Sequence, residues 1–121
     1  MTNASAVLAM VMLTGATAAG APVEHISCPE GPYHAKPFTM TVDYGAKTVQ
    51  TSGVEPEPES LNFTDTTVEW GFMRGSAIYH RDTHLFEWDT RAERWYLDMI
   101  GHPSTQPDAW FMGTATCEVG R

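Results

Sequence analysis

Alternation of apolar and polar residues with a period of two is the feature that most restricts the fold of this chain. Between Phe38 and Tyr44 every second residue is apolar, and the residues between them are polar. Side chains of a β-strand point alternately to opposite faces, so this segment predicts a strand with one face in a core. The same alternation recurs in residues 68–72, 84–89 and 94–100. The chain is therefore predicted to be all-β.

Turn residues separate these segments at short intervals. Residues 45–46 are expected to turn the first strand into a hairpin with residues 47–51, and residues 82–83 to form a tight two-residue turn between strands 76–81 and 84–89. We find no segment with a sustained helical period. Short strands joined in this way indicate a single antiparallel meander.

Such a meander has to cover its apolar face, either by curling into a small barrel or half-barrel (calycin-like) or by folding on itself as a sandwich. The chain has two cysteines, Cys28 and Cys117. We expect one disulfide between them, which would join the first strand region to the last and would stabilise the fold by roughly 4–5 kcal/mol. Because a closed or nearly closed barrel places those regions side by side, the barrel is favoured.

The start of the chain predicts export. Residues 1–23 contain no charged side chain, and an apolar run at 6–13 is followed by small residues at 15–19. We expect residues 1–19 to be a signal peptide and residues 20–121 to be a single β domain. The run is shorter than the roughly 20 residues that span a bilayer, so no membrane insertion is expected after cleavage. A periplasmic or secreted location and a disulfide support each other.

The charge restricts the class of partner. The formal net charge of −8 over 121 residues argues against nucleic-acid binding, which needs clustered Lys and Arg. Glu55, Glu57 and Glu59 alternate with prolines in residues 52–60, a segment that cannot pair in a ladder and is predicted to be an extended, solvated loop. It is interpreted as a surface linker or, alternatively, as an acidic docking arm for a basic partner.

One compact cluster of possible metal ligands occurs in the chain. His80, Asp82 and His84 flank the predicted 82–83 turn, and two imidazoles with a carboxylate could bind Zn or Cu. The alternative is that Asp82 forms the turn and the two histidines are cross-strand neighbours on a solvated face.

Catalysis is not expected. Glu69, Glu87 and Asp89 lie beside tryptophans, as a glycan-cleaving site would require, but outward strand faces of any acidic protein look the same. With the cysteines in a disulfide no thiolate nucleophile remains, and no cofactor is expected. Asn62 begins an Asn-X-Thr sequence, which matters only in a eukaryotic secretory pathway.

The four tryptophans exceed what a core of this size needs. A small barrel can use two or three of them to fill its interior, which leaves a fourth for a binding surface for proteins, sugars or lipids.

Several short motifs are similar to those of small exported bacterial β-sheet proteins of uncharacterised function. The motifs are Val42-Asp43-Tyr44, Val68-Glu69-Trp70, Ile78-Tyr79-His80-Arg81-Asp82-Thr83, and Gly113 with Cys117. This resemblance implies an exported β-sheet domain.

A second resemblance is to periplasmic inhibitors of c-type lysozyme, which are small barrels with a terminal cysteine pair. It rests on Gly75-Ser76-Ala77-Ile78-Tyr79, which resembles the Ser-Gly stretch that those inhibitors insert into the lysozyme cleft. The binding surface that we expect comprises Gly75, Ser76, Tyr79, Trp88, Glu55, Glu57 and Glu59.

The sequence thus predicts an exported binding or accessory protein rather than an enzyme, with a basic protein or a cell-wall component as its partner. Two alternatives stay open. One is an inhibitor of a basic cell-wall hydrolase such as c-type lysozyme, and the other is a metal-binding protein that uses the His80–His84 hairpin.

Overall fold

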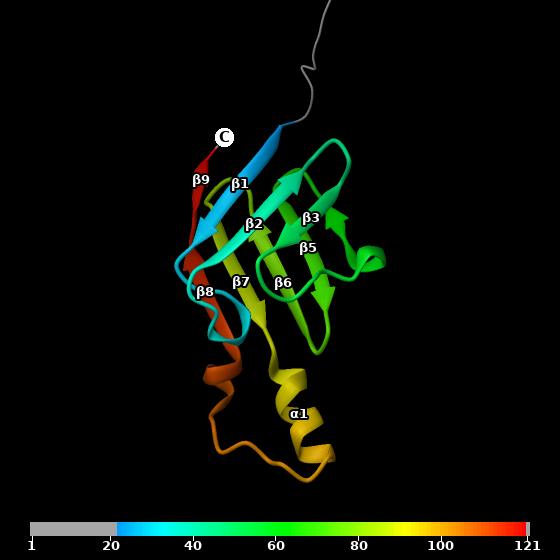
Figure 1. Cartoon of the computed structure of the whole chain (residues 1–121), viewed down its shortest axis with the longest axis vertical. Coiled ribbons are helices and arrows are strands. Elements are labelled where there is room, and N and C mark those ends of the chain that lie inside the picture. Colours follow the sequence, from blue (N-terminus) through cyan, green and yellow to red (C-terminus); the bar gives the residue numbers. More distant parts are fainter. Residues whose placement is uncertain (1–21, 121) are drawn as a thin grey trace, which may run out of the picture.

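The computed structural model describes residues 22–120, and the predicted signal peptide 1–19 lies outside them. Two antiparallel sheets lie face to face, and their strands cross in Figure 1. The four-stranded sheet has the order β3-β2-β1-β9 and the five-stranded sheet the order β4-β5-β6-β7-β8. The strands are β1 Val23–Cys28, β2 Phe38–Asp43, β3 Thr48–Thr51, β4 Asn62–Phe63, β5 Thr67–Phe72, β6 Gly75–His80, β7 Leu85–Asp89, β8 Met112–Thr116 and β9 Glu118–Gly120.

One α-helix, α1 (Arg91–Met99), interrupts the five-stranded meander between β7 and β8. Together with the segment that follows it, α1 forms one end of the molecule, opposite the end where β1 begins (Figure 1). Within residues 22–120 the chain also forms short 3₁₀ turns, which are η2 Pro32–His34, η3 Pro58–Ser60 and η4 Asp108–Phe111.

The strands that alternate in sequence alternate in burial as well. In β2, Phe38, Met40 and Val42 face the core, and in β5, Val68 and Trp70 do so together with Phe72. This confirms the half-buried strands predicted from the period of two.

The core lies between the two sheets and centres on Phe86. Its ring stacks on Phe38 of the facing sheet, with 5.3 Å between ring centroids, and contacts Trp70 and Trp88 at 5.8 and 5.5 Å. Aromatic pairs at these separations add to the energy of apolar burial. The sheets are therefore held together by aromatic side chains from both layers.

The disulfide between Cys28 and Cys117 is confirmed, and both cysteines are buried. Cys117 is the one residue between β8 and β9, so it marks the point where the chain passes from one sheet to the other. Since β9 then pairs with β1, the bond links the two sheets along one side.

The predicted barrel is not closed. On the side opposite Cys117, no strand pairing joins β3 to β4 within residues 22–120. Side chains fill this opening instead: the rings of Tyr44 and Phe63 meet edge to face at 6.0 Å, and Lys47 lies over Phe63. The structure thus has two antiparallel sheets joined along one side.

The predicted strand 94–100 is wrong, because residues 94–99 belong to α1 and Ile100 caps its C-terminal end. Trp95 and Met99 are spaced by four residues, a spacing that places two side chains on one face in a helix as well as in a strand. Gly101 ends the helix with φ of 82°. Its N–H donates to the Asp98 carbonyl and the His102 N–H donates to the Leu97 carbonyl, which is the Schellman pattern of helix ends.

Candidate functional site

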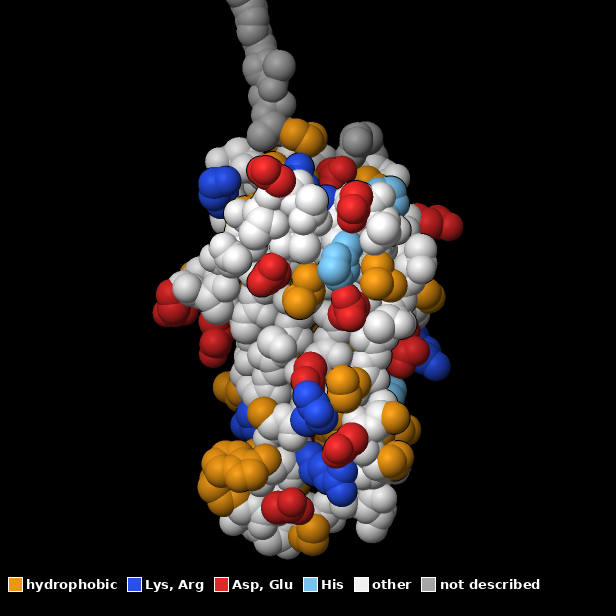
Figure 2. Space-filling view, turned by 180° about the vertical axis from the view of Figure 1, so that it is seen from behind, with side chains coloured by type: hydrophobic (Ala, Val, Ile, Leu, Met, Phe, Trp, Pro, Cys, Tyr) orange, Lys and Arg blue, Asp and Glu red, His pale blue; other side chains and the backbone are white. Residues whose placement is uncertain are grey.

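Large apolar side chains are exposed at the end of the molecule that α1 forms. Trp95 is 65% exposed, Met99 61% and Met73 63%. With Ile100 and Tyr33, also exposed, they make up a surface that we call the apolar end. Figure 2 shows a cluster of hydrophobic side chains at one side of this end, next to acidic and basic side chains. Exposed aromatic and Met side chains in one place are typical of interaction surfaces.

Helix α1 buries none of its residues. A surface helix normally hides an apolar stripe against the core, but here Trp95 and Met99 share a face that points to solvent. The helix is thus positioned by something other than a buried apolar stripe.

Polar contacts hold α1 in place. Arg74, in the turn between β5 and β6, donates from Nε to Glu93 at 2.6 Å, and its guanidinium lies 4.1 Å from the centre of the Tyr96 ring. Arg94 pairs with Asp108 of η4. Because charged contacts of this kind do not need the apolar face of the helix, that face is left uncovered.

The start of α1 is fixed by the two residues before it. Thr90, which is buried, donates from both its N–H and its hydroxyl to the Phe111 carbonyl, at 2.6 and 2.8 Å. Asp89 accepts the Arg91 N–H at 2.9 Å and pairs with its guanidinium. These bonds lower the pKa of the Asp89 carboxyl below its ordinary value.

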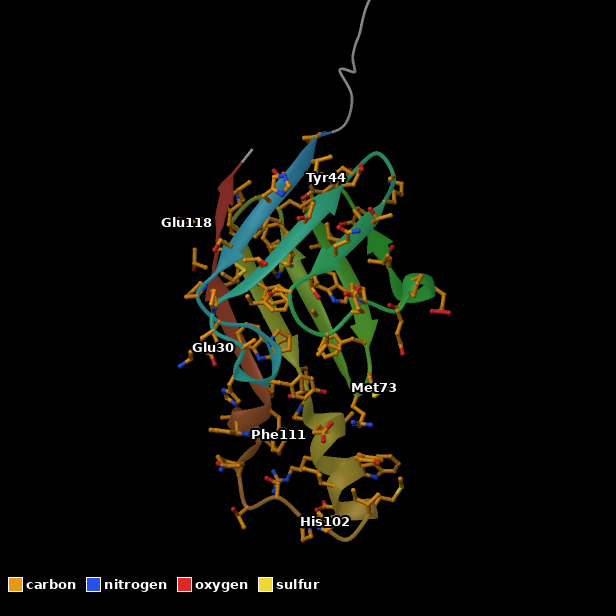
Figure 3. All side chains as sticks on the ribbon, viewed as in Figure 1. Glu30, Tyr44, Met73, His102, Phe111 and Glu118 are labelled. Carbon is orange, nitrogen blue, oxygen red and sulfur yellow. A yellow bond between two sulfur atoms is a disulfide. The ribbon has the colours of Figure 1, made fainter. Side chains whose placement is uncertain are left out.

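Tyr33 connects the apolar end to the sheets. Its hydroxyl donates to the Met73 carbonyl at 3.0 Å, and its ring meets Phe72 edge to face. Burial raises the pKa of the Tyr33 phenol, and the nearby Glu93 carboxylate acts in the same direction. In Figure 3, Met73 lies beside the first turn of α1 while His102 marks the far tip.

A shallow hollow of about 320 Å³ joins this end to the acidic loop. Tyr33, Val54, Met73, Arg74 and Glu93 line it. Val54 lies within the predicted acidic loop 52–60, directly before Glu55, so this loop forms part of the rim of the hollow. The apolar end and the acidic loop therefore border one another.

Glu55, Glu57 and Glu59 are exposed, and no strand forms in residues 52–60, as predicted. The loop is nevertheless tied to the sheet. The Glu57 N–H donates to the Gly71 carbonyl at 2.8 Å, and the Ser60 hydroxyl accepts the Gly71 N–H at 2.7 Å. The three carboxylates thus project from a fixed backbone.

The charges differ between the apolar end and its neighbouring loop. Arg74, Arg91 and Arg94 are each paired with a carboxylate. In the acidic loop, none of the ion pairs found among residues 22–120 involves Glu55, Glu57 or Glu59. A partner would therefore meet a charge-balanced apolar surface beside an acidic one.

Two aromatic residues of the predicted binding surface lie in the core. Tyr79 is 0% exposed and Trp88 is 7% exposed. The β6–β7 register places Tyr79 opposite Phe86, on the inner face of the five-stranded sheet, so the Tyr79 ring is not presented to a partner. Gly75 and Ser76 begin β6 near the turn that carries Arg74, and Ser76 is exposed.

The outer face of the five-stranded sheet carries a groove of about 550 Å³. Ser76, Ile78, Glu87, Asp89, Met112 and Thr114 contribute to its lining. Three carboxylates of this face are held by neighbours: Thr67 donates to Glu69, His80 lies 2.6 Å from Glu87, and Arg91 binds Asp89.

The structure does not bring the predicted metal ligands together. Within residues 22–120, no group of three or more His, Cys, Asp and Glu is arranged to hold a metal ion. His80 contacts Glu87, whereas His84 stacks near Tyr79, and the connection runs over four residues from Arg81 to His84 instead of the predicted two.

Sequence analysis missed α1, and with it most of the apolar end. Two signals were present: Thr90 with Glu93 three residues later, the usual start of a helix, and Gly101 at its end. Of the four tryptophans, Trp70 and Trp88 are buried while Trp95 and Trp110 are exposed.

No protein-family model, curated protein or solved structure matches this chain. Among the helices in residues 22–120, none has the length and apolar character needed to cross a bilayer.

Proposed function

We propose that this chain is an exported binding protein that docks a protein partner through the apolar end and the adjoining acidic loop. The observation that carries the proposal is that α1 buries none of its residues and exposes Trp95 and Met99. Trp and Met are enriched where proteins contact each other, and Trp residues often dominate the binding energy.

The partner is expected to be basic. Glu55, Glu57 and Glu59 project beside the apolar end, and the chain carries a net charge of −8. Complementary charge speeds encounter and suppresses wrong partners, whereas the apolar centre supplies affinity. C-type lysozyme is a basic cell-wall hydrolase and so meets the charge requirement, which makes inhibition of such an enzyme the more specific form of the proposal.

Export is supported by two features. Residues 1–19 have the composition of a signal peptide, and the Cys28–Cys117 disulfide is of a kind that persists in oxidising compartments. Periplasmic or secreted protein is expected to begin after Ala19. Mass spectrometry of the exported protein tests this, and a retained leader would refute it.

Binding is proposed over catalysis because the side chains that distinguish this surface are apolar. The Gly75–Tyr79 stretch, which resembles a lysozyme-contacting segment, has its aromatic side chain in the core. Inhibitory contacts would therefore come from Trp95 and Met99, supported by the acidic loop.

Calorimetric titration with c-type lysozyme, together with a lysozyme activity assay, tests the proposal. We expect Trp95→Ala to weaken binding by about 10-fold or more, as for a central interface residue, and Val23→Ala, a truncation of an exposed side chain on β1, to leave binding unchanged. Replacement of Glu55, Glu57 and Glu59 by Gln should slow association and reduce its dependence on salt.

Two outcomes would count against the proposal in different ways. If the wild-type protein does not bind lysozyme, the inhibitor form is refuted. If it binds and Trp95→Ala and Val23→Ala bind equally well, the apolar end is not the contact surface. Hydrogen exchange of α1 in the complex provides an independent check, since a docked helix should exchange more slowly.

A further inference from the structure

Strand β8 is an edge of the five-stranded sheet, and within residues 22–120 no strand pairs with its outer side. With five residues it is the longest of the four edge strands, since β3 has four, β9 three and β4 two. Its sequence, Met-Gly-Thr-Ala-Thr, contains no charge and no proline. Charges, prolines or a short length normally prevent an exposed edge strand from pairing with another chain. Strand β8 has neither charge nor proline, so its edge can pair with another strand.

Hydrogen bonds at both ends of β8 show which backbone groups point outward. The Cys117 N–H donates to the His84 carbonyl, and the Thr90 N–H donates to the Phe111 carbonyl. Bonded and non-bonded pairs alternate along an antiparallel ladder. In the register between β7 and β8, the residues whose N–H and C=O groups turn away from β7 are Met112, Thr114 and Thr116.

We propose that β8 pairs antiparallel with β8 of a second copy of this chain, about a two-fold axis at Thr114. Thr114 would face Thr114 of the partner subunit, and Met112 would face Thr116 of the partner subunit. The three outward residues are spaced evenly about Thr114. The N–H and C=O groups of these residues in one copy therefore meet the C=O and N–H groups of the same residues in the other, as a self-complementary dimer contact requires.

The side chains suit this arrangement. Met112, Thr114 and Thr116 are all exposed, and Thr–Thr pairs across antiparallel strands are favourable. The groove on the outer sheet face reaches Met112 and Thr114, so in the dimer it would continue across the axis.

The net negative charge of each copy opposes the dimer and makes its salt dependence a test of the proposal. Each chain carries a net charge of −8, whereas β8 carries none. Repulsion between the two bodies is screened by salt while the contact itself is not. Added salt should therefore strengthen the dimer.

Sedimentation velocity of the exported protein, from about 10 μM to about 1 mM, covers the range of a small interface. We expect the dimer fraction to rise with concentration and with salt. A monomer throughout this range at both low and high salt would overturn the proposal.

Two variants at the axis test the geometry. Thr114→Glu and Thr114→Lys each place like charges opposite one another, which should raise the dimer dissociation constant at least about fivefold. An equal mixture of the two should restore a heterodimer. Thr48→Glu, on the exposed face of β3, should dimerise like the wild-type protein.

Circular dichroism checks that the variants are folded. The mixture is itself a second safeguard, because variants that fail to fold cannot rescue one another. If both variants dimerise as well as the wild-type protein, or if the mixture forms no heterodimer, β8 pairing is refuted. Neither result bears on the apolar end, which lies outside β8.

Discussion

Removal of the Cys28–Cys117 disulfide has an effect that follows from the chain topology. The cysteines are 89 residues apart, so the bond closes nearly the whole described chain into one loop. The chain-entropy relation for a loop of this size gives a loss of about 4.6 kcal/mol at 25 °C when the bond is removed. A domain of this size is stable by only about 5–15 kcal/mol, so the loss is a large share of the total.

Urea unfolding, followed by the fluorescence of the buried Trp70 and Trp88, measures this loss. With a slope of about 1.5 kcal/mol per M, the midpoint should fall by about 3 M. Two forms of the protein separate the loss of the covalent bond from the loss of sulfur packing. Reduced wild-type protein keeps both sulfur atoms in the core, whereas the double variant Cys28→Ala with Cys117→Ala also loses their packing. The double variant should be the less stable of the two.

The bond also secures β9, which has three residues and follows Cys117 directly. Amide exchange in β9 should therefore accelerate more than exchange in β6 when the bond is reduced. A loss below about 1 kcal/mol, less than a quarter of the predicted value, would refute the reasoning. It would mean that the unfolded chain already holds its two ends together.

Two further predictions concern the ends of α1. Gly101→Ala should cost about 1 kcal/mol of stability because φ is 82° there; nothing lies within 4 Å of the new methyl group, so the cost comes from the backbone conformation. Amide exchange should show that the last helical turn frays. Gly120→Ala, where φ is not positive, is the control, and equal losses would contradict the explanation. The lowered pKa of Asp89 means that its bonds to Arg91 stabilise the fold above the unfolded pKa of 3.8 and are lost as pH falls through the lower folded value. Asp89→Asn should therefore have a lower urea midpoint than the wild-type protein at neutral pH, and the two midpoints should converge as pH falls below 3.8 and through the lower folded pKa of Asp89; a difference that does not change with pH would contradict this.

The sequence by itself determined the features that depend on local alternation. The side chains of β2, β5 and β7 divide between core and solvent as their period of two predicts, because successive strand residues must point to opposite faces. The disulfide was predictable because the chain has two cysteines, and the exposure of Glu55 was predictable because prolines prevent the loop from pairing.

Local alternation could not determine whether residues 91–100 form a helix or a strand. Trp95 and Met99 fall on one face in either conformation, so the apolar pattern does not separate a helix from a strand. The ends of the segment decide in favour of the helix. At its start, the Thr90 hydroxyl donates to the carbonyl of Phe111, which is distant in the chain, and at its end Gly101 adopts a positive φ that terminates the helix.

Tertiary structure alone decided which apolar side chains remain exposed and which sheet edges remain unpaired. Trp88 and Trp95 are the same residue type in similarly alternating segments, yet the β6–β7 register buries Trp88, whereas Arg74 holds α1 through Glu93 and leaves Trp95 in solvent. The passage of the chain between sheets at Cys117 likewise leaves β8 as an open edge. Both outcomes depend on contacts between residues far apart in the chain, which no local pattern contains.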